Sequence, residues 1–489
     1  MRLRSRPRGP RRPHGPRPLA ALALVTAVVT AAGCTGDTSG GPGGPGGPGG
    51  SGAGDPYFPK AGNGGYDVSH YALDLAYDPA AHHLTGTATI TARATEDLTA
   101  LNLDLEGLDV ERVTVDGDTA RRRHAGQELT VRPARALERG RTFRVVVRYS
   151  GAPVTVTDPD GSEEGWLRTA DGAVALGQPT GSMAWFPGNH HPSDKATYTV
   201  TATVPKGLRA VSNGEPAGER TKGDRTAFTW RTAEPMASYL ALLAVGRYET
   251  GRTTTRGGLP VHTAVDPRQA AASRAVLARI PEAVEWAEGW FGPYPFSSAG
   301  AVVERPGDAG YALETQNRPV FAGAPDTLLL VHELVHQWYG NSVTPKTWRD
   351  MWLNEGFATY AEWLWREDHG DGTAQETFDA LYAGTYFPEA AANEAVWSFP
   401  PARPPGAAHI SGAPVYQRGA MVLHRIRRTV GDDAFRALLR GWAAEHRHGN
   451  ADTADFTAYV ERSAPDEDFD AVWSDWLYGE GKPARPSEP

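Results

Sequence analysis

The residues of this sequence best suited to chemistry are two histidines and a glutamate in the apolar stretch 326–341. His332 and His336 are four residues apart, so on a helix their imidazoles share one face and can bind one metal ion. Glu333 can reach a water on that ion without being a ligand. The alternative is a buried core helix whose polar residues are satisfied by neighbours. The spacing favours a zinc site with Glu333 as the general base.

A catalytic zinc has three protein ligands and an open position for water, so a third ligand is expected elsewhere. Glu355 follows His336 after eighteen residues, a spacing that lets a second helix fold back beside the first. Glu362 lies two helical turns further on the same face, where it can accept the second ring N–H of a zinc histidine. We therefore predict one Zn²⁺ per chain, bound by His332, His336 and Glu355.

The elements that must position these residues follow from the period of the apolar residues. From Tyr66 to about Glu249 this period is two, which predicts an antiparallel β domain with one buried face. From about Thr250 the spacing becomes helical, in 273–291, 326–340, 347–367 and 415–431, and 299–321 reads as strand, loop and strand. Asp326 is the expected N-cap of the second helix and Gly340 its stop. The prediction is a multi-domain protein with a β domain over 56–249 and a mixed α+β domain over 250–485.

The N-terminal residues are typical of an exported protein. Residues 1–33 begin with six arginines among the first twelve positions and continue with an apolar run shorter than the about 20 residues that span a bilayer. Cys34, the only cysteine, follows this run and resembles the lipid-accepting cysteine of a bacterial lipobox. A stray cysteine is the alternative. Residues 34–55 are rich in Gly and Pro and predict a flexible linker. We expect export and a lipid anchor on Cys34 at the outer face of the bacterial cell membrane, or else secretion.

Composition excludes some classes of function. The formal net charge is −9, so there is no basic footprint for nucleic acid. A single cysteine allows no intramolecular disulfide, so stability must come from burial and from any bound metal. The 489 residues suffice for two or three domains with their own cores.

Several segments, in order along the chain, resemble the aminopeptidase N family of zinc metallopeptidases, which are gluzincins. Besides the two zinc helices, these are EPMASYLALLAVGRYE (234–249), WFGPYPF (290–296), VYQRGA (415–420) and VWSDWLYGEGKP (472–483). The resemblance extends from about Tyr66 to Pro483. It implies a thermolysin-like catalytic domain behind the β domain, in a bacterial short form without the helical C-terminal domain of longer relatives.

The resemblance also implies roles for residues outside the zinc helices. In GYALET, Glu314 corresponds to the glutamate that binds the free α-amine of the substrate, and Gly310 to the first glycine of that motif, with one extra residue between them. Tyr416 corresponds to the tyrosine that donates to the oxyanion. In GQPTGS, Gln178 corresponds to a second amine-binding residue, while Thr180 occupies a position that is usually acidic. Half of the usual anionic pocket would then be missing.

Together these features predict a zinc peptidase that removes N-terminal residues from peptides. One alternative is a zinc peptidase with little need for a free amine, or an epoxide-hydrolase-like relative. Another is a surface peptide-binding protein without catalysis, which would not need both Glu333 and Tyr416. The adjacent His190 and His191 could suggest a second metal site, although such pairs more often belong to a polar loop.

Overall fold

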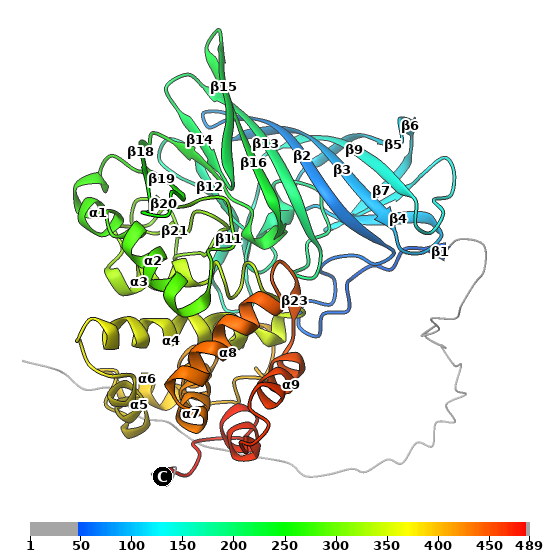
Figure 1. The fold of residues 1–489 in the computed structure, drawn as a ribbon. Coiled ribbons are helices and arrows are strands. Elements are labelled where there is room, and N and C mark those ends of the chain that lie inside the picture. Colours follow the sequence, from blue (N-terminus) through cyan, green and yellow to red (C-terminus); the bar gives the residue numbers. More distant parts are fainter. Residues whose placement is uncertain (1–46, 486–489) are drawn as a thin grey trace, which may run out of the picture. The chain divides into compact units, whose positions relative to one another are not determined.

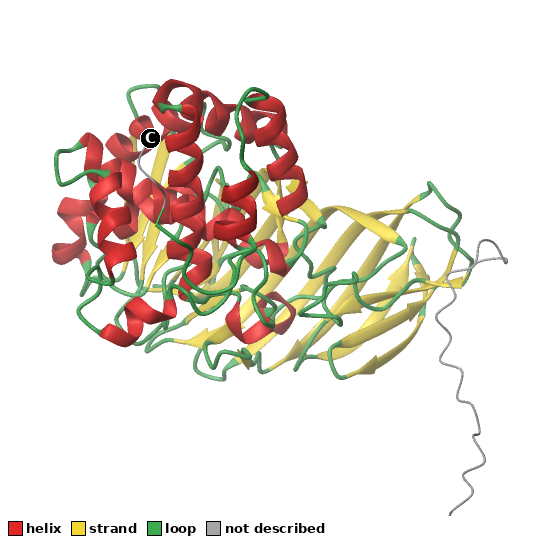
Figure 2. Cartoon of the chain, turned by 90° about the horizontal axis from the view of Figure 1, so that it is seen from below, coloured by secondary structure: helices red, strands yellow, loops and turns green. Residues whose placement is uncertain are grey.

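The computed structural model describes residues 47–485, shown in Figures 1 and 2. The expected export signal, Cys34 and the first part of the expected linker lie outside the described residues. In this described range, no helix is both long enough and apolar enough to cross a membrane. Strands fill the N-terminal half and helices gather in the C-terminal half (Figure 2), which confirms the predicted order of a β domain and a mixed catalytic domain.

The largest sheet of the N-terminal half has eight strands, and its buried face follows the predicted alternation. In β2, Tyr71, Leu73, Leu75 and Tyr77 are buried while the residues between them are not. Most neighbours are antiparallel, but β13 runs parallel to β2, so the sheet is mixed. In spatial order the strands are β15 (Glu215–Lys222), β16 (Arg225–Ala237), β13 (Lys195–Pro205), β2 (Tyr66–Asp78), β3 (His83–Ala94), β9 (Thr142–Gly151), β5 (Asp109–Val115) and β6 (Asp118–Thr119).

Two smaller sheets complete the N-terminal half. One pairs β1 (Gly47–Pro48), β4 (Leu98–Asp104), β8 (Glu128–Arg132) and β7 (Arg121–Ala125) in that order. The other has the order β10 (Thr155–Thr157), β11 (Glu163–Arg168), β12 (Ala173–Leu176), β17 (Leu243–Gly246) and β14 (Arg209–Ser212). The turn between β10 and β11 carries the sequence DPDGS, whose Asp, Pro and Gly favour a tight reversal of the chain.

The C-terminal half begins with a four-stranded sheet and continues as helices (Figure 1). The stretch 273–291, expected as one helix, is divided between two, because Pro281 occupies the first turn of α2, where a missing N–H costs nothing. The strands are β18 (Glu249–Thr254), β19 (Pro260–Val265), β20 (Ala299–Val303) and β21 (Val320–Phe321), with the small pair β22 (Thr344–Pro345) and β23 (Asn450–Ala451). The helices are α1 (Ala270–Leu277), α2 (Ile280–Phe291), α3 (Thr327–Val335), α4 (Trp352–Asp368), α5 (Ala374–Ala383), α6 (Ala390–Ala395), α7 (Gly419–Val430), α8 (Asp432–Glu445) and α9 (Thr453–Ser463).

Helix α3 carries the expected metal-binding histidines and begins where the sequence predicts. The side chain of Asp326 accepts a hydrogen bond from the Leu329 amide at 2.9 Å, as an N-cap does. The helix ends earlier than predicted, at Val335, with His336 as its C-cap. Beyond it the chain tightens into turns and reaches Gly340, whose φ of +118° lies in the region that favours glycine.

The segment that carries Tyr416 also differs from the expected single helix over 415–431. A π-helical turn, Pro414–Arg418, precedes α7, and such turns are frequent at functional sites. The buried Arg418 guanidinium holds this turn by donating to the carbonyl oxygens of Trp476 at 2.9 Å and Asp475 at 2.8 Å. Both acceptors lie in a second π-helical turn, Val472–Leu477.

Buried polar contacts join the two halves of the chain. The Lys195 ammonium, on β13, donates to the carbonyl oxygens of Asn341 at 3.0 Å, Ser342 at 2.9 Å and Gly449 at 3.2 Å. Asp55 is 2% exposed and accepts from the Trp348 amide at 2.9 Å. Removing the partners of a buried or partly buried charge is costly, so these contacts fix the β domain against the C-terminal half.

Candidate active site

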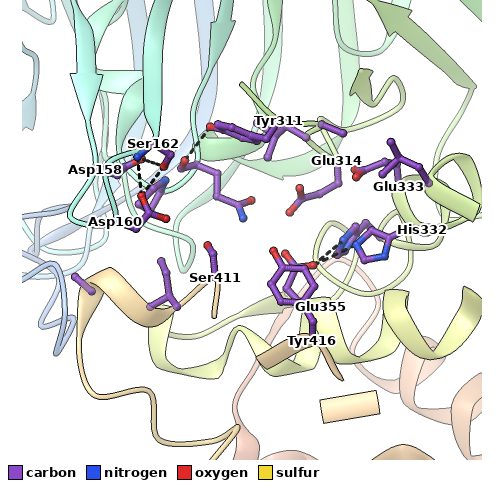
Figure 3. Close-up of a pocket in the computed structure, with 18 of the residues that line it drawn as sticks. Asp158, Asp160, Ser162, Tyr311, Glu314, His332, Glu333, Glu355, Ser411 and Tyr416 are labelled. Atoms are coloured by element: carbon purple, nitrogen blue, oxygen red, sulfur yellow. Dashed lines mark hydrogen bonds and ion pairs between the residues drawn. The ribbon is translucent and has the colours of Figure 1, made fainter. Parts of the chain in front are cut away.

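Helices α3 and α4 bring the three expected metal ligands to one point. The Nε2 atoms of His332 and of His336 each lie 3.3 Å from Oε2 of Glu355. All three ligand atoms lie within 4.8 Å of one another, and all three residues are buried. All three side chains line a common cavity of about 390 Å³. Figure 3 shows His332 and Glu355 at this cavity.

Both histidines are oriented by a second contact of the ring. His332 Nδ1 is 2.7 Å from Oε1 of Glu362, two turns along α4 from Glu355. His336 Nδ1 donates to the carbonyl oxygen of Tyr339 at 3.1 Å. Partners of this kind fix the tautomer and point the free Nε2 of each ring at the metal position. The structure thus brings Glu362 to the place expected from its spacing.

The donor set fits zinc. A tetrahedral ion with bonds of about 2.0–2.1 Å separates its ligand atoms by about 3.3–3.4 Å, and the two His–Glu separations are 3.3 Å. Two imidazoles and one carboxylate, with a fourth side open to the cavity, are the ligands of a catalytic rather than a structural zinc site. A second group, Glu314, Glu333 and His336, also lies within 4.8 Å but offers a single imidazole.

The charges around the metal position are strongly coupled. Burial disfavours a charge on His336, but Glu355 and Glu314 outweigh it and raise its pKa to about 9. Burial likewise opposes the charge on Glu355, yet His336 and His332 lower its pKa to about 2. The site therefore stabilises positive charge between these three side chains, which is what a divalent cation supplies.

Glu333 and Tyr416 flank the ligands without belonging to them. Glu333 is 5% exposed, its Oε2 has no hydrogen-bond partner among the described residues, and burial raises its pKa to about 8. The Tyr416 ring stacks beside His332 with centroids 6.2 Å apart. Burial and then the charges of Glu355, Glu314 and Glu333 raise the pKa of Tyr416 well above its usual value, so the phenol remains a proton donor.

Tyr416 is brought to Glu355 by a close crossing of α4 and α7. A Cβ added at Gly356 would lie 3.0 Å from the carbonyl carbon of Gly419 and 3.1 Å from its Cα. A side chain at Gly356 would force the two backbones slightly apart, so the glycine pair permits their close approach. Neither glycine nor Arg418 was singled out as a positioning residue from the sequence, because the contacts named here join residues more than 50 positions apart.

Two of the three expected substrate-binding residues line the cavity. Glu314 is 3% exposed, and its Oε1 has no hydrogen-bond partner among the described residues. Gln178 also lines the cavity, and its Oε1 likewise has no hydrogen-bond partner among the described residues. Gly310 is exposed and does not line the cavity, because the lining segment begins at Tyr311. The structure therefore does not bring Gly310 into the site.

The wall near Gln178 contains carboxylates that the sequence reasoning missed. Thr180, at the usually acidic position, donates from its amide and hydroxyl to Oε1 of the buried Glu164 at 2.9 and 3.0 Å. Asp158 and Asp160, in the β10–β11 turn, line the cavity (Figure 3). The only sequence signal was the turn-forming DPDG, which does not reveal that this turn faces residues 150 positions further along.

His190 and His191 belong to the polar loop that was favoured for them. His190 Nε2 contacts the carbonyl oxygen of Phe186 at 3.0 Å, and burial lowers its pKa to about 4. His191 contacts Ser193 Oγ at 2.7 Å and Asp55 at 3.4 Å. Within residues 47–485, no group of three possible metal ligands includes either of them.

A β domain followed by a helical domain with this His–His–Glu set defines a two-domain zinc metallopeptidase. Residues 67–240 match the Peptidase M1 N-terminal domain, and residues 322–476 match the Peptidase family M1 domain. The chain is 30% identical to the M1 zinc metallopeptidase of Deinococcus radiodurans, with a TM-score of 0.80 over 90% of this chain and 99% of that structure. The chain belongs to peptidase family M1.

Two further comparisons bear on substrates. A variant of the Deinococcus protein solved with a Tyr-Ser-Ala substrate is 31% identical, with a TM-score of 0.80 over 90% of this chain and all of that one. Bovine glutamyl aminopeptidase is 25% identical over 441 residues, which are 81% of this chain and 45% of that protein. The chain thus spans less than half the length of this curated relative.

Proposed function

We propose that this protein is a zinc-dependent aminopeptidase, which removes residues one at a time from the N-terminus of peptides. The observation that carries the proposal is Glu314, a buried carboxylate with an unpaired oxygen in the same cavity as the metal ligands. An ammonium is the substrate group that such a carboxylate binds best. The substrate-bound relative and the names of the curated relatives support the same reaction.

The protein groups divide the reaction between them. When bound by His332, His336 and Glu355, zinc supplies Lewis-acid polarisation of the scissile carbonyl and acidifies water. Glu333 takes a proton from the attacking water and later gives it to the leaving amine. The Tyr416 hydroxyl donates to the oxygen on which negative charge develops. Glu314 and Gln178 hold the substrate ammonium, which places the first peptide bond at the reacting groups.

A paired assay tests this proposal. The zinc-loaded protein should hydrolyse an aminoacyl amide with a free amine much faster than the N-acetylated form of the same amide. Equal rates for the two amides would show that the protein is a peptidase that needs no free amine. Binding of both forms without hydrolysis would support a non-catalytic peptide-binding protein. Turnover of an epoxide alone would support an epoxide-hydrolase-like relative.

We also propose that the protein is exported and anchored by a lipid on Cys34. The support is the order of the sequence: arginines, a short apolar run, a lone cysteine and a Gly/Pro-rich stretch. In a bacterial host, Cys34→Ser should release the protein from the membrane fraction or leave it unprocessed. A processed Cys34→Ser protein that stays on the membrane would contradict the anchor.

A further inference from the structure

The end of the cavity away from the metal ligands is acidic. Asp158, Asp160, Ser162 and Ser411 line this end (Figure 3). Figure 3 shows Asp158 and Asp160 on one side of the cavity, and Glu314, His332 and Glu355 on the other. Among the described residues, no lysine or arginine lines the cavity. We call Asp158, Asp160 and Ser162 the acidic wall.

Hydrogen bonds within the β10–β11 turn hold the acidic wall in place. Asp160 Oδ1 accepts from the amide of Ser162 at 2.9 Å and from its hydroxyl at 2.6 Å. The Asp158 amide donates to the Ser162 carbonyl oxygen at 2.9 Å. Asp158 is 8% exposed, whereas Asp160 is exposed. Because Ser162 occupies only Oδ1 of Asp160, the second oxygen can accept from a ligand.

Glu164, a buried carboxyl next to Asp158, takes up a proton in its place and leaves Asp158 charged. Burial raises the pKa of Asp158 to about 6, still below neutrality. Burial and the charge of Asp158 raise the pKa of the adjacent Glu164 well above its usual value, so Glu164 is the member of the pair that holds a proton. A neutral Glu164 leaves the charge on the groups that face the cavity.

The position of Glu314 decides which part of a substrate reaches the wall. A peptide whose scissile carbonyl lies at the metal ligands and whose amine lies at Glu314 has no residue before that amine. Glu314 and Gln178 both line the cavity, and Oε1 of each has no hydrogen-bond partner among the described residues. No residue precedes the amine, so the acidic wall can meet the side chain of the first residue but no earlier part of the peptide.

We propose that this cavity selects peptides whose first residue is arginine or lysine, with Asp160 and Asp158 binding the cationic side chain. The proposal deepens the proposed function and rests on it. A guanidinium or ammonium between these carboxylates gains charge-assisted hydrogen bonds, while an acidic side chain meets like charge and an aliphatic one leaves the carboxylates without a partner.

The test separates binding from catalysis. The affinities of L-argininamide, L-leucinamide and L-isoglutamine, the α-amide of glutamic acid, are measured calorimetrically on zinc-loaded Glu333→Gln protein. The same measurement is made with Asp160→Asn added. We expect argininamide to bind most tightly and to lose about three- to tenfold in affinity with Asp160→Asn, the range of an ion pair at a partly enclosed site. Leucinamide should change less than about twofold on the same grounds.

Glu163→Gln is the matched control, since it removes one charge from the same hairpin at an exposed position that does not line the cavity. It should leave all three affinities unchanged. Equal affinities for the three amides, or an arginine preference that survives Asp160→Asn, would overturn the proposal. Hydrolysis of the same amides by the unmutated protein reports on the proposed function separately. Selective binding of argininamide without hydrolysis would contradict the proposed aminopeptidase activity but would support the proposed selectivity.

Discussion

The two ends of the cavity are built in opposite ways. At the metal end, helical spacing puts His332 and His336 on one face, and the packing of α4 beside α3 brings Glu355 to 3.3 Å from both. At the other end, Asp160 and Ser411 come from the β10–β11 turn and from a loop about 250 residues further along the chain. The metal ligands can thus be predicted from short-range spacing in the sequence. The residues proposed to select substrates cannot, because they come from segments far apart in the chain.

The difference predicts that variants at the metal end will abolish the reaction for every substrate. Variants at the acidic wall should instead change the order of preference among substrates. A variant at Glu314 should slow the hydrolysis of all free-amine substrates to the same extent. Four variants, taken from the largest expected effect to the smallest, test this division.

Glu333→Gln should lower turnover by about 10²- to 10⁴-fold, as loss of a general base does. Because Glu333 is not a ligand, zinc measured by elemental analysis should remain at one ion per chain. His336→Ala is the matched control and should lose most of the zinc as well as the activity. Near-normal turnover in Glu333→Gln would remove that residue from the mechanism, and full zinc in His336→Ala would refute the ligand set.

Tyr416→Phe should cost about 10²- to 10³-fold in kcat, because the phenol donates to charge that develops only in the transition state. KM should change little for the same reason. A rise in KM with kcat intact would make Tyr416 a substrate-binding residue.

Glu314→Gln should slow hydrolysis of free-amine substrates by about 10- to 100-fold, the value of a hydrogen bond to a charged group. It should leave any slow turnover of N-acetylated substrates unchanged. The ratio of the two rates is the quantity to follow. If that ratio is the same in the variant and the unmutated protein, Glu314 is not the amine anchor.

Gly356→Ala should reduce kcat by about three- to tenfold, since its Cβ would push α7 and Tyr416 away from α4. Zinc content should be unchanged. Gly289→Ala in α2 is the control, because an added Cβ there meets nothing within 4 Å and should stabilise the helix by about 0.5–1 kcal/mol. Full activity in Gly356→Ala would show that the crossing does not position Tyr416.

The sequence predicted whatever depends on local periodicity. The alternation in β2, the Asp326 cap and the placement of Glu362 against His332 all follow from residues a few positions apart or on one helix face. The early end of α3 and the π-helical turn at Tyr416 were missed, since they depend on tertiary contacts such as those of Arg418.

The acidic wall shows the same limit at longer range. Thr180 suggested that half of the anionic pocket was missing, because it stands where the family motif usually has an acidic residue. The carboxylates at this side of the cavity come instead from Asp158 and Asp160, on another hairpin. No local pattern relates that hairpin to Glu314, so only the folded chain shows that they share a cavity.

The most direct test of the central claim is a time course of peptide shortening followed by mass spectrometry. The substrate is a peptide with a free N-terminal arginine, compared with its N-acetylated form and incubated with zinc-loaded protein. If the metal site catalyses hydrolysis and Glu314 binds the substrate amine, single residues should be lost from the free N-terminus. The acetylated peptide should remain intact. Internal cleavage, removal of two residues at a time, or equal shortening of both peptides would contradict the account.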